Sequence, residues 1–348
     1  MNNKIHITLQ EGQTRDIHFP GFVLERLEKL GSVSYNNTGR PYTAENLAEE
    51  AGDADICITH WGSPCFTEEV LRKMPNLKLI AHAAGSVADL CSAAVYDRNI
   101  KVTSANDIMA LYVAEGVLAY ILTSLRQIPK TDSLMKNGVL WPRDINPRPE
   151  SLRNKKVSLI GLGATGRCLL HLLKPFNVDI AVYDPYITQA QINAEFIATG
   201  NNPNVRLTSL EEALAFGDIV SVHASLTPET TGLLGARELA AIRDNGLLIN
   251  TARGAVIDEK ALVRELQSGR LSAVLDVYDP EPPAPDNPMR KLENVLLMPH
   301  MAGVTAREEM TIAIIGEIER FRQGQPLLYE IRRERFEKMT RHHLVRAL

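Results

Sequence analysis

The sequence contains little cysteine and little excess charge. Its 348 residues include 4 cysteines, which form neither a CxxC pair nor a spacing typical of zinc ligands. Neither a disulfide framework nor a metal site is therefore expected. The formal net charge of −4 gives no electrostatic footprint for nucleic acid or for an anionic membrane.

Long apolar runs are also scarce. The N-terminal segment MNNKIHITLQEGQTR lacks the apolar core of a signal peptide, and no stretch approaches the roughly 20 apolar residues of a membrane span. The apolar fraction of 45% and the charged fraction of 23% are typical of a globular protein, and the length suits two domains. We therefore expect a soluble cytoplasmic protein, with neither a membrane nor a nucleic acid as a partner.

Short apolar runs alternate with helical patterns in both halves of the chain, which predicts parallel sheets. In the first half, strands are expected at 5–9, 56–59, 77–81 and 101–103, and helices at 22–29 and 67–73. In the second half, strands are expected at 219–223, 246–250, 273–276 and 295–298, and a helix at 304–322. The basic cluster in the charged tail is expected to be a solvated helix face.

A long apolar segment follows Asn106 and Asp107, which form a capping signal. The run IMALYVAEGVLAYILTSLRQI is apolar on nearly every helical face, so we expect a helix that is buried between domains or subunits. The proline-rich stretch at 141–149 is expected to be an irregular connection.

The segment KVSLIGLGATGRCLLHLLKPFNVDIAVYDP predicts a dinucleotide site. An apolar strand leads into three glycines, and a helix follows. Gly161 permits the tight turn, Gly163 lets the backbone approach a pyrophosphate, and Gly166 lets the helix pack closely on the sheet. A second strand ends at Asp184, whose carboxylate can accept from both ribose hydroxyls of NAD and would repel the 2′-phosphate of NADP. We predict NAD as the cofactor; the alternative is a structural turn without a ligand.

Three further segments end predicted strands, at the edge where open α/β sheets bind ligands. Arg253 stands at the end of one strand and is followed at once by a glycine. Glu281 lies five residues beyond Asp276, in a turn stiffened by prolines. His300 lies just beyond the last strand.

These segments, in this order behind the glycine turn, resemble the D-isomer-specific 2-hydroxyacid dehydrogenase family. The resemblance covers roughly residues 77–325, and its matching runs are SLTPETTG, NTARGAVIDEKAL, LDVYDPEPP and NVLLMPHMAGVT. An arginine, a glutamate and a histidine are catalytic in that family, and they correspond here to Arg253, Glu281 and His300. The resemblance also implies a homodimer, with 108–149 as the dimerisation region.

The chemistry of these three side chains fits such roles. Arg253 offers a planar fork that can bind a carboxylate and polarise the adjacent carbonyl. His300 can act as the acid in reduction and as the base in oxidation, while Glu281 would hold its other ring nitrogen. Each side chain also has a structural alternative: an arginine paired with Asp258 or Glu259, a solvated glutamate with Asp279 in its place, and a core histidine. Five other histidines are expected to be structural: His6, His60, His82, His171 and His223.

The predicted cofactor site combines the glycine turn with the ends of later strands, and Asp276 is expected to accept from the nicotinamide carboxamide. Its residues are Gly161, Gly163, Ala164, Thr165, Gly166, Asp184, Thr227, Thr251, Ala252, Arg253, Asp276 and His300. In the family, backbone N–H groups of a glycine loop hold the substrate carboxylate. The predicted substrate-binding residues are Gly85, Ser86, Val87, Arg253 and Trp61.

Two features bear on the substrate. The glycine loop continues as Val87-Ala88-Asp89, where a common family pattern has an Asp-Asn run, so its shape departs from that pattern. The segment at 59–66 contains neither lysine nor arginine, so a substrate phosphate would lack an obvious partner there. Trp61 is a candidate wall of a compact pocket, with core packing as the alternative. A small 2-keto acid such as glyoxylate or hydroxypyruvate is therefore preferred over phosphoglycerate.

The expected fold is two Rossmann-like, doubly wound parallel-sheet domains with the active site in the cleft between them. Residues 1–106 plus 303–348 are expected to form a discontinuous substrate-binding domain, and 107–302 the NAD-binding domain. The expected activity is the NAD-dependent interconversion of a small 2-keto acid and its D-2-hydroxy acid, with His300 as acid and base. The alternatives are an NAD(H)-sensing regulator of the corepressor kind, a phosphoglycerate dehydrogenase and a phosphite dehydrogenase.

Overall fold

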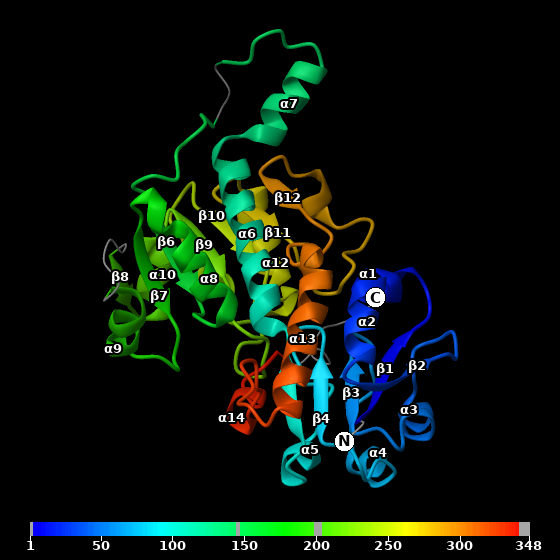
Figure 1. Ribbon diagram of the computed structural model, residues 1–348. Helices are drawn as coiled ribbons and strands as arrows, with labels where there is room; N and C mark the ends of the chain where they lie inside the picture. The colour runs from blue at the N-terminus through cyan, green and yellow to red at the C-terminus, as the bar shows by residue number, and fades with distance from the viewer. Residues whose placement is uncertain (1–2, 144–146, 198–203, 341–348) are drawn as a thin grey trace. The chain divides into compact units, whose positions relative to one another are not determined.

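The computed structural model describes residues 3–143, 147–197 and 204–340 (Figure 1). The described chain divides into two compact units, each built on its own sheet. Residues up to Met109 and the described residues from Val304 onward form the first unit, and Ala110–Gly303 form the second. The first division falls inside helix α6 (Asn106–Leu125).

The first unit contains a five-stranded parallel sheet in the order β2-β1-β3-β4-β5. Every residue of β3 and β4 is buried, as expected for parallel strands that are covered on both faces. The strands are β1 (Asn3–Gln10), β2 (Gly31–Asn36), β3 (Ile56–Thr59), β4 (Leu79–His82) and β5 (Lys101–Ser104). The helices are α1 (Gln13–His18), α2 (Gly21–Glu28), α3 (Ala44–Glu50), α4 (Glu68–Arg72), α5 (Ala93–Asp97), α13 (Arg307–Arg322) and α14 (Arg333–Phe336).

The second unit contains a seven-stranded parallel sheet in the order β12-β11-β10-β9-β6-β7-β8. Its strands are β6 (Lys156–Ile160), β7 (Asp179–Tyr183), β8 (Val205–Leu207), β9 (Ile219–Val222), β10 (Leu247–Asn250), β11 (Ser272–Leu275) and β12 (Val295–Leu297). Besides most of α6, its α-helices are α7 (Ile128–Lys136), α8 (Ala164–Leu173), α9 (Gln189–Ile192), α10 (Leu210–Phe216), α11 (Ala236–Ala241) and α12 (Glu259–Gln267).

The central strands of the second unit bury side chains on both faces of the sheet. Along β10, Leu248 belongs to one hydrophobic cluster, whereas Leu247 and Ile249 belong to the cluster on the opposite face. Helices cover both faces, which explains why these strands are continuous apolar runs in the sequence (Figure 1). The strand order reverses direction at β6, which lies between β7 and β9, so β6 marks the switch point of this doubly wound sheet.

The two predicted parallel sheets are confirmed. All eight strands listed in the sequence analysis are present, with ends within two residues of the expected positions. Strands β2 and β8 were not predicted; they are edge strands with the polar sequences GSVSYN and VRL. An edge strand is only partly covered, so it lacks the apolar run that identified the central strands.

The expectation that no segment approaches the length and composition of a membrane span is wrong for α6. This helix has 20 residues, and its most apolar window has a mean hydropathy of 1.8. Only 22% of that window is buried, and the buried residues of α6 are Ala110, Ala114, Val117 and Ile121. One such helix is weak support for a membrane protein, because the core helix of a soluble protein passes the same test.

The charged tail is more deeply packed than the sequence suggested. Ile331, Phe336 and Met339 are buried and join the core of the first unit. Of its basic residues, Arg335 is partly exposed and pairs with Asp107 at the start of α6. The tail is therefore a solvated face on one side only, and its last residues, 341–348, lie outside the described part of the chain.

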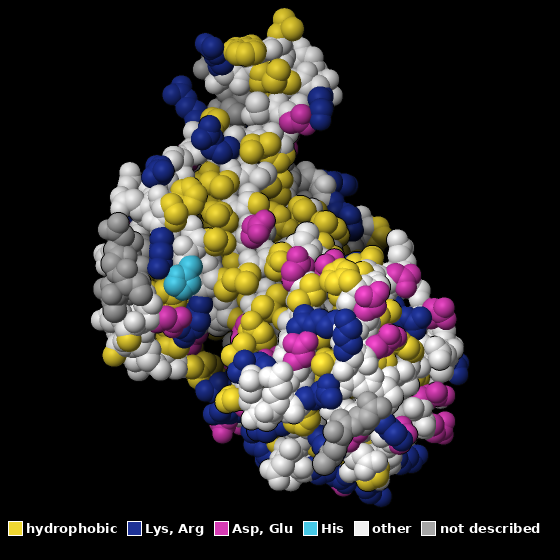
Figure 2. All heavy atoms as spheres, in the orientation of Figure 1, with side chains coloured by type: hydrophobic (Ala, Val, Ile, Leu, Met, Phe, Trp, Pro, Cys, Tyr) yellow, Lys and Arg dark blue, Asp and Glu magenta, His cyan; other side chains and the backbone are white. Residues whose placement is uncertain are grey.

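An arm of the second unit continues from α6 into α7 and the segment after it (Figure 1). No residue of α7 is buried within the chain. Hydrophobic side chains run along α6 and onto this arm in the space-filling view (Figure 2). The large exposed apolar residues of α6 and the arm are Leu111, Ile128, Met135, Val139, Leu140 and Trp141. The expected connection at 141–149 continues from the arm and is described only in part, because 144–146 lie outside the described residues.

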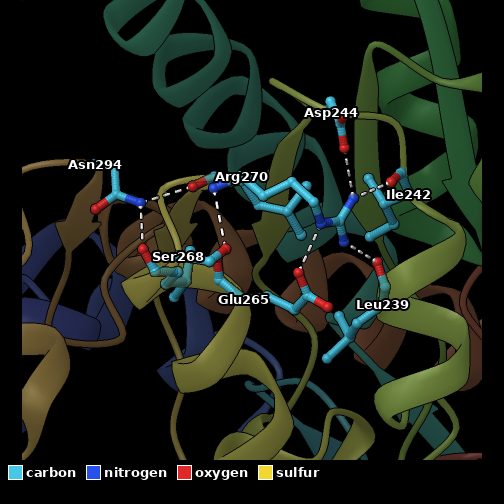
Figure 3. A network of polar contacts seen from close by, with 9 residues as sticks. Leu239, Ile242, Asp244, Glu265, Ser268, Arg270 and Asn294 are labelled. Atoms are coloured by element: carbon cyan, nitrogen blue, oxygen red, sulfur yellow. Dashed lines mark hydrogen bonds and ion pairs between the residues drawn. The ribbon is translucent and has the colours of Figure 1, made fainter.

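A polar network anchors the amino ends of β10 and β11, opposite the edge where their strands finish (Figure 3). The Arg270 guanidinium donates to Glu265 Oε2 over 2.7 Å and to the Leu239 carbonyl oxygen over 2.7 Å. It also donates to the carbonyl oxygen of Ile242. One planar cation therefore joins α11, α12 and the segment that leads into β10.

Replacing Arg270 should destabilise the protein without changing the structure of the opposite edge of the sheet, where the strands end. We expect Arg270→Met to lower the free energy of unfolding by about 2–3 kcal/mol, because it leaves two carbonyl oxygens and a carboxylate without their charged donor. Arg237→Met is the matched control, since Arg237 pairs with Glu211 at the surface and should contribute less than ~0.5 kcal/mol. Equilibrium denaturation of both variants tests this, and equal losses would contradict it.

Candidate active site

The candidate site of the second unit lies along one edge of its sheet. All seven strands are parallel, so the segments that follow them emerge on the same side. The glycine turn follows β6, Asp184 follows β7, and Thr227 lies in the loop after β9. Arg253, Asp276 and His300 follow β10, β11 and β12.

Two glycines of the turn are required by the protein's own backbone. Gly161 has φ of +96°, and a Cβ there would lie 2.8 Å from the Ala224 nitrogen in the loop after β9. A Cβ on Gly166 would lie 2.6 Å from the Gly161 carbonyl oxygen, so α8 can approach the turn only with a glycine at this position. Gly163 differs, because a Cβ there would meet nothing within 4 Å. The open space beside Gly163 is where a ligand can reach the backbone.

The Asp184 side chain is hydrogen-bonded to the backbone of the glycine turn. Its Oδ2 accepts from the Leu162 N–H over 2.8 Å, and its Oδ1 accepts from the Tyr186 N–H over 2.8 Å. Each carboxylate oxygen retains a further lone pair, so two ribose hydroxyls can still be accepted. Asp184 thus has a structural role in fixing the glycine turn as well as the geometry expected of a ribose acceptor.

Other predicted cofactor residues surround the same edge. Ala164 and Thr165 begin α8, so their N–H groups belong to the helix N-terminus that faces the turn. The Thr227 N–H is bonded to Thr230 Oγ1 over 2.8 Å, which fixes the loop after β9. The Thr251 hydroxyl is buried and has no hydrogen-bond partner among the described residues. An open backbone approach together with an unsatisfied buried hydroxyl fits a bound dinucleotide.

The loop that carries Arg253 is fixed by the last residue of β10. Asn250 is buried; its Nδ2 donates to the Arg253 carbonyl oxygen over 3.0 Å, and its Oδ1 accepts from the Ala252 N–H over 3.0 Å. The following residue must be glycine, because a Cβ on Gly254 would lie 1.9 Å from the Tyr278 carbonyl carbon. The Arg253 loop therefore packs directly against the segment that leads to Glu281.

Glu281 and His300 form the central pair of the site. His300 Nδ1 lies 2.6 Å from Glu281 Oε1, and the two side chains are 46% and 23% exposed. A carboxylate on one ring nitrogen orients the imidazole and leaves Nε2 available for proton transfer. His300 is also half exposed, unlike a core histidine.

The charged neighbours of Arg253 in sequence have other hydrogen bonds. Asp258 caps α12 by accepting from the Ala261 N–H over 3.0 Å. Glu259 accepts from Asn287 Nδ2 over 2.9 Å, and burial raises its pKa. These contacts give each acid a structural task in α12 and the loop beside it.

Asp276 has a role that the sequence did not indicate. The residue is 1% exposed, and its two oxygens accept from the Met301 and Ala302 N–H groups over 2.9 and 3.0 Å. The Tyr120 hydroxyl, from α6, donates to Asp276 Oδ1 over 3.4 Å. Burial and the charge of Asp276 raise the pKa of Tyr120 to about 12, so this hydroxyl remains a donor. Asp276 thus holds the backbone that follows His300.

The predicted substrate loop belongs to the first unit and follows β4. Val87 is fully buried, so it can offer a ligand only its backbone. Ser86 Oγ accepts from the Ala88 N–H and donates to the Thr340 carbonyl oxygen over 2.8 Å, which shapes the loop. Within the described residues, the N–H groups of Gly85, Ser86 and Val87 have no hydrogen-bond acceptor.

Trp61 lies beside a pair of buried histidines in the first unit. The Trp61 ring is edge-on to the His60 ring at 4.6 Å, and His60 Nε2 lies 3.3 Å from His18 Nδ1. Burial lowers the pKa of His18 to about 4 and that of His60 to about 2, and the positive charge of Arg307 contributes to both shifts. No local sequence pattern links this arginine to Trp61, because the two residues are 246 positions apart.

The other four histidines have contacts typical of structural residues. His6 lies 2.8 Å from Ser34 Oγ, and His82 lies 3.0 Å from Thr59 Oγ1. His223 lies 2.9 Å from Ser221 Oγ, and His171 packs against a phenylalanine ring at 4.9 Å. Among the described residues, no group of histidine, cysteine and acidic side chains could hold a metal ion.

The fold and the edge of the second sheet define a dinucleotide-binding α/β protein. The profile of the D-isomer specific 2-hydroxyacid dehydrogenase NAD-binding domain matches residues 118–302. The chain therefore belongs to the D-isomer specific 2-hydroxyacid dehydrogenase family, and NAD(H) is the cofactor of the matched domain.

Several known proteins are similar over most of this chain. A D-3-phosphoglycerate dehydrogenase of Archaeoglobus fulgidus is 34% identical over 262 residues, which are 74% of this chain and 48% of that protein. A glyoxylate reductase of Thermofilum pendens is 33% identical over 306 residues, which are 85% of this chain and 86% of that protein. The crystal structure of a phosphoglycerate oxidoreductase from Rhizobium etli has a TM-score of 0.78 at 25% identity, covering 95% of this chain and 99% of that one. The chain spans about half the length of the phosphoglycerate dehydrogenases that it matches.

Substitutions in the glycine turn can distinguish an effect on ligand binding from an effect on folding. Gly163→Ala should leave the melting temperature unchanged, because its φ of −72° suits alanine and the space is open. It should weaken NADH binding about tenfold or more, because the new methyl group occupies the pyrophosphate approach. Fluorescence titration with NADH provides the measurement.

Two further substitutions complete that comparison. Gly166→Ala should lower the melting temperature, because the Cβ meets the Gly161 carbonyl oxygen. Gly21→Ala, also in open space, should change neither property. Unchanged NADH affinity in Gly163→Ala would show that the dinucleotide does not approach this glycine.

Proposed function

We propose that this protein interconverts a small 2-keto acid and its D-2-hydroxy acid, with NAD(H) as the hydride carrier. The observation that carries the proposal is the pairing of His300 with Glu281 at 2.6 Å, next to a loop that presents Arg253. A cation, a proton donor and a carboxylate that orients the donor are the groups that reduction of a keto acid requires.

Each side chain has a definite task in this reaction. Bound NADH supplies the hydride for the carbonyl carbon. Arg253 binds the substrate carboxylate and polarises the neighbouring carbonyl group. His300 Nε2 donates a proton to the carbonyl oxygen, while Glu281 stabilises the protonated ring through Nδ1. In the oxidative direction, neutral His300 removes the hydroxyl proton. Backbone N–H groups of Gly85, Ser86 and Val87 are the proposed second set of carboxylate ligands.

Asp184 supports a preference for NAD over NADP. Its carboxylate stands at the end of β7 and already fixes the glycine turn through the Leu162 N–H. A 2′-phosphate would bring negative charge towards this carboxylate, whereas two ribose hydroxyls would donate to it.

The preferred substrate is a compact 2-keto acid of the glyoxylate or hydroxypyruvate kind. Trp61 is 44% exposed and offers an apolar wall rather than a charged group. A substrate with a distal phosphate is the second candidate, because Arg307 places a positive charge near His18 and His60, beside Trp61. This charge contributes to the lowered pKa of both histidines. The glyoxylate reductase and phosphoglycerate dehydrogenase relatives correspond to these two possibilities.

NADH oxidation by the purified protein, followed at 340 nm, tests the proposed reaction. Glyoxylate, hydroxypyruvate, pyruvate and 3-phosphohydroxypyruvate should be compared, with NADPH in parallel. We expect turnover with one compact keto acid and NADH. His300→Ala should reduce kcat by at least about 100-fold with little change in NADH affinity, because only proton transfer is lost. Glu281→Gln should reduce kcat less and change its pH profile.

Other outcomes of that assay identify the alternatives. NADH binding without turnover of any keto acid would favour an NAD(H)-sensing regulator. Oxidation of phosphite with NAD in the same preparation would identify a phosphite dehydrogenase. Loss of NADH binding in His300→Ala would refute the proposed role of this histidine.

We also propose that the protein is a homodimer that pairs through α6 and the arm. A nine-residue helix such as α7, with no residue buried in its own chain, lacks the packing that stabilises a short helix in water. The exposed fractions of Leu140 and Trp141 are 91% and 66%, which is unusual for large apolar side chains. Pairing of two copies would bury both groups of residues.

Sedimentation velocity tests the dimer. The wild-type protein should sediment as a dimer, and Leu140→Asp combined with Trp141→Asp should raise the dimer dissociation constant about 30-fold or more, as for the loss of interface hot spots. Leu328→Asp, at a 65% exposed leucine of the first unit, is the matched control and should remain dimeric. A monomeric wild-type protein would contradict the proposal.

A cytoplasmic location is the last part of the proposal. Cys57 and Cys91 are buried free thiols. Free thiols are typical of a reducing compartment, which is also where NAD(H)-dependent reactions have their cofactor pool.

A further inference from the structure

The backbone of His300 is in an unusual conformation. Its φ is +51°, a left-handed value that costs a residue with a Cβ roughly 1–2 kcal/mol in the absence of support. The His300 side chain is 46% exposed, so packing around the ring does not fix its position. The direction of the imidazole therefore depends on what holds the backbone on either side of it.

The backbone before His300 is held by Tyr278. Its hydroxyl lies 2.9 Å from the carbonyl oxygens of both Leu275 and Met298, between which it shares its one proton. The Met298 N–H also donates to the Leu275 carbonyl oxygen over 2.8 Å. These contacts tie the end of β12 to the end of β11, up to two residues before the histidine.

The backbone after His300 is held by Asp276. One carboxylate captures the N–H groups of Met301 and Ala302, the next two residues along the chain. Both bonds have a charged acceptor, are close to 3 Å long, and are shielded from water because Asp276 is 1% exposed. A carboxylate can satisfy both N–H groups with acceptor oxygens, whereas the amide of asparagine has only one acceptor atom.

Helix α6 packs against the same turn. The Tyr120 hydroxyl donates to Asp276 Oδ1 over 3.4 Å. One turn earlier in the helix, a Cβ on Gly116 would lie 3.1 Å from the Ala302 carbonyl oxygen and 3.2 Å from its Cα. The glycine therefore lets α6 lie close against the residue that Asp276 binds.

We propose that Asp276, supported by Tyr120, is a positioning residue that holds His300 in its left-handed conformation and thereby directs its imidazole towards Glu281. The inference rests on the proposed function, since positioning matters for turnover only if His300 transfers a proton. It gives Asp276 a task that is independent of any contact with the nicotinamide. The structural part of the inference concerns the backbone alone and holds whatever the substrate is.

Asp276→Asn tests the structural part directly. The crystal structure of this variant should show residue 300 with a negative φ, or a His300–Glu281 separation above hydrogen-bond distance. The His300 ring signals in an NMR spectrum of histidine-labelled protein, assigned by their loss in His300→Ala, should shift as well. Retention of the left-handed conformation and of the wild-type ring signals would overturn the proposal. Neither readout requires an active enzyme.

Kinetics then separate positioning from cofactor binding. Asp276→Asn should lower kcat about 10- to 100-fold, as expected when one charge-assisted bond to the loop is lost, with less than about a threefold change in NADH affinity. The pH profile of kcat/KM should change as it does in Glu281→Gln, because both variants separate the same pair. Loss of NADH affinity together with an unchanged profile would instead assign Asp276 to the cofactor alone.

Two further variants complete the experiment. Asp218→Asn is the matched control, because Asp218 also accepts a backbone N–H, that of Lys156 over 2.9 Å, but lies at the amino edge of the same sheet. It should leave kcat and the His300 signals unchanged. Tyr120→Phe keeps the ring and removes only the hydroxyl, so it serves if Asp276→Asn does not fold. A two- to fivefold lower kcat with unchanged NADH affinity and shifted ring signals would support the proposal, and unchanged signals would oppose the part assigned to Tyr120.

If the protein proves to have no dehydrogenase activity, the kinetic comparison is lost but the structural comparison remains. A wild-type enzyme that turns over keto acids, combined with an Asp276→Asn structure identical at residue 300, would refute the positioning role alone. An inactive wild-type protein whose Asp276→Asn variant has a displaced His300 would refute the proposed function alone.

Discussion

Every strand of the Ala110–Gly303 unit runs in the same direction, and the candidate site depends on that constraint. A parallel sheet brings the carboxyl ends of its strands to one edge, so residues that are far apart in sequence become neighbours without any long loop. Asp184 reaches the glycine turn in this way, and His300 reaches Glu281. The remaining order of the site comes from short-range contacts at this edge, such as those of Asn250 with the Ala252 N–H and the Arg253 carbonyl oxygen.

The close packing of loops at this edge explains the positions of several glycines. The segment before Glu281 passes so near Gly254 that no side chain fits between them, and the loop after β9 crosses Gly161 in the same manner. Such glycines are determined by neighbouring backbone rather than by a ligand. Gly163 is the exception, since the protein leaves the space beside it open. Glycines of one sequence motif can therefore be required for different physical reasons.

The sequence predicted the central strands well because burial on both faces makes them continuous apolar runs. It also predicted that Arg253 and His300 lie just beyond the ends of strands, which are β10 and β12. The edge strands β2 and β8 escaped prediction because a partly covered strand has no such pattern. Contacts between distant segments were equally hidden: neither Tyr120 beside Asp276 nor Arg307 beside the histidine pair leaves a local signal. Helix α6 was misjudged because apolar composition does not reveal what covers a helix.

The exposed apolar face of α6 has a consequence for how the protein is made. If two copies pair through α6 and the arm as proposed, a newly synthesised chain exposes the apolar residues of both until it meets its partner. By length and composition alone, α6 is also apolar enough to cross a membrane. Under that proposal, the rate of subunit encounter, or retention by a chaperone until it happens, would govern the yield of assembled protein.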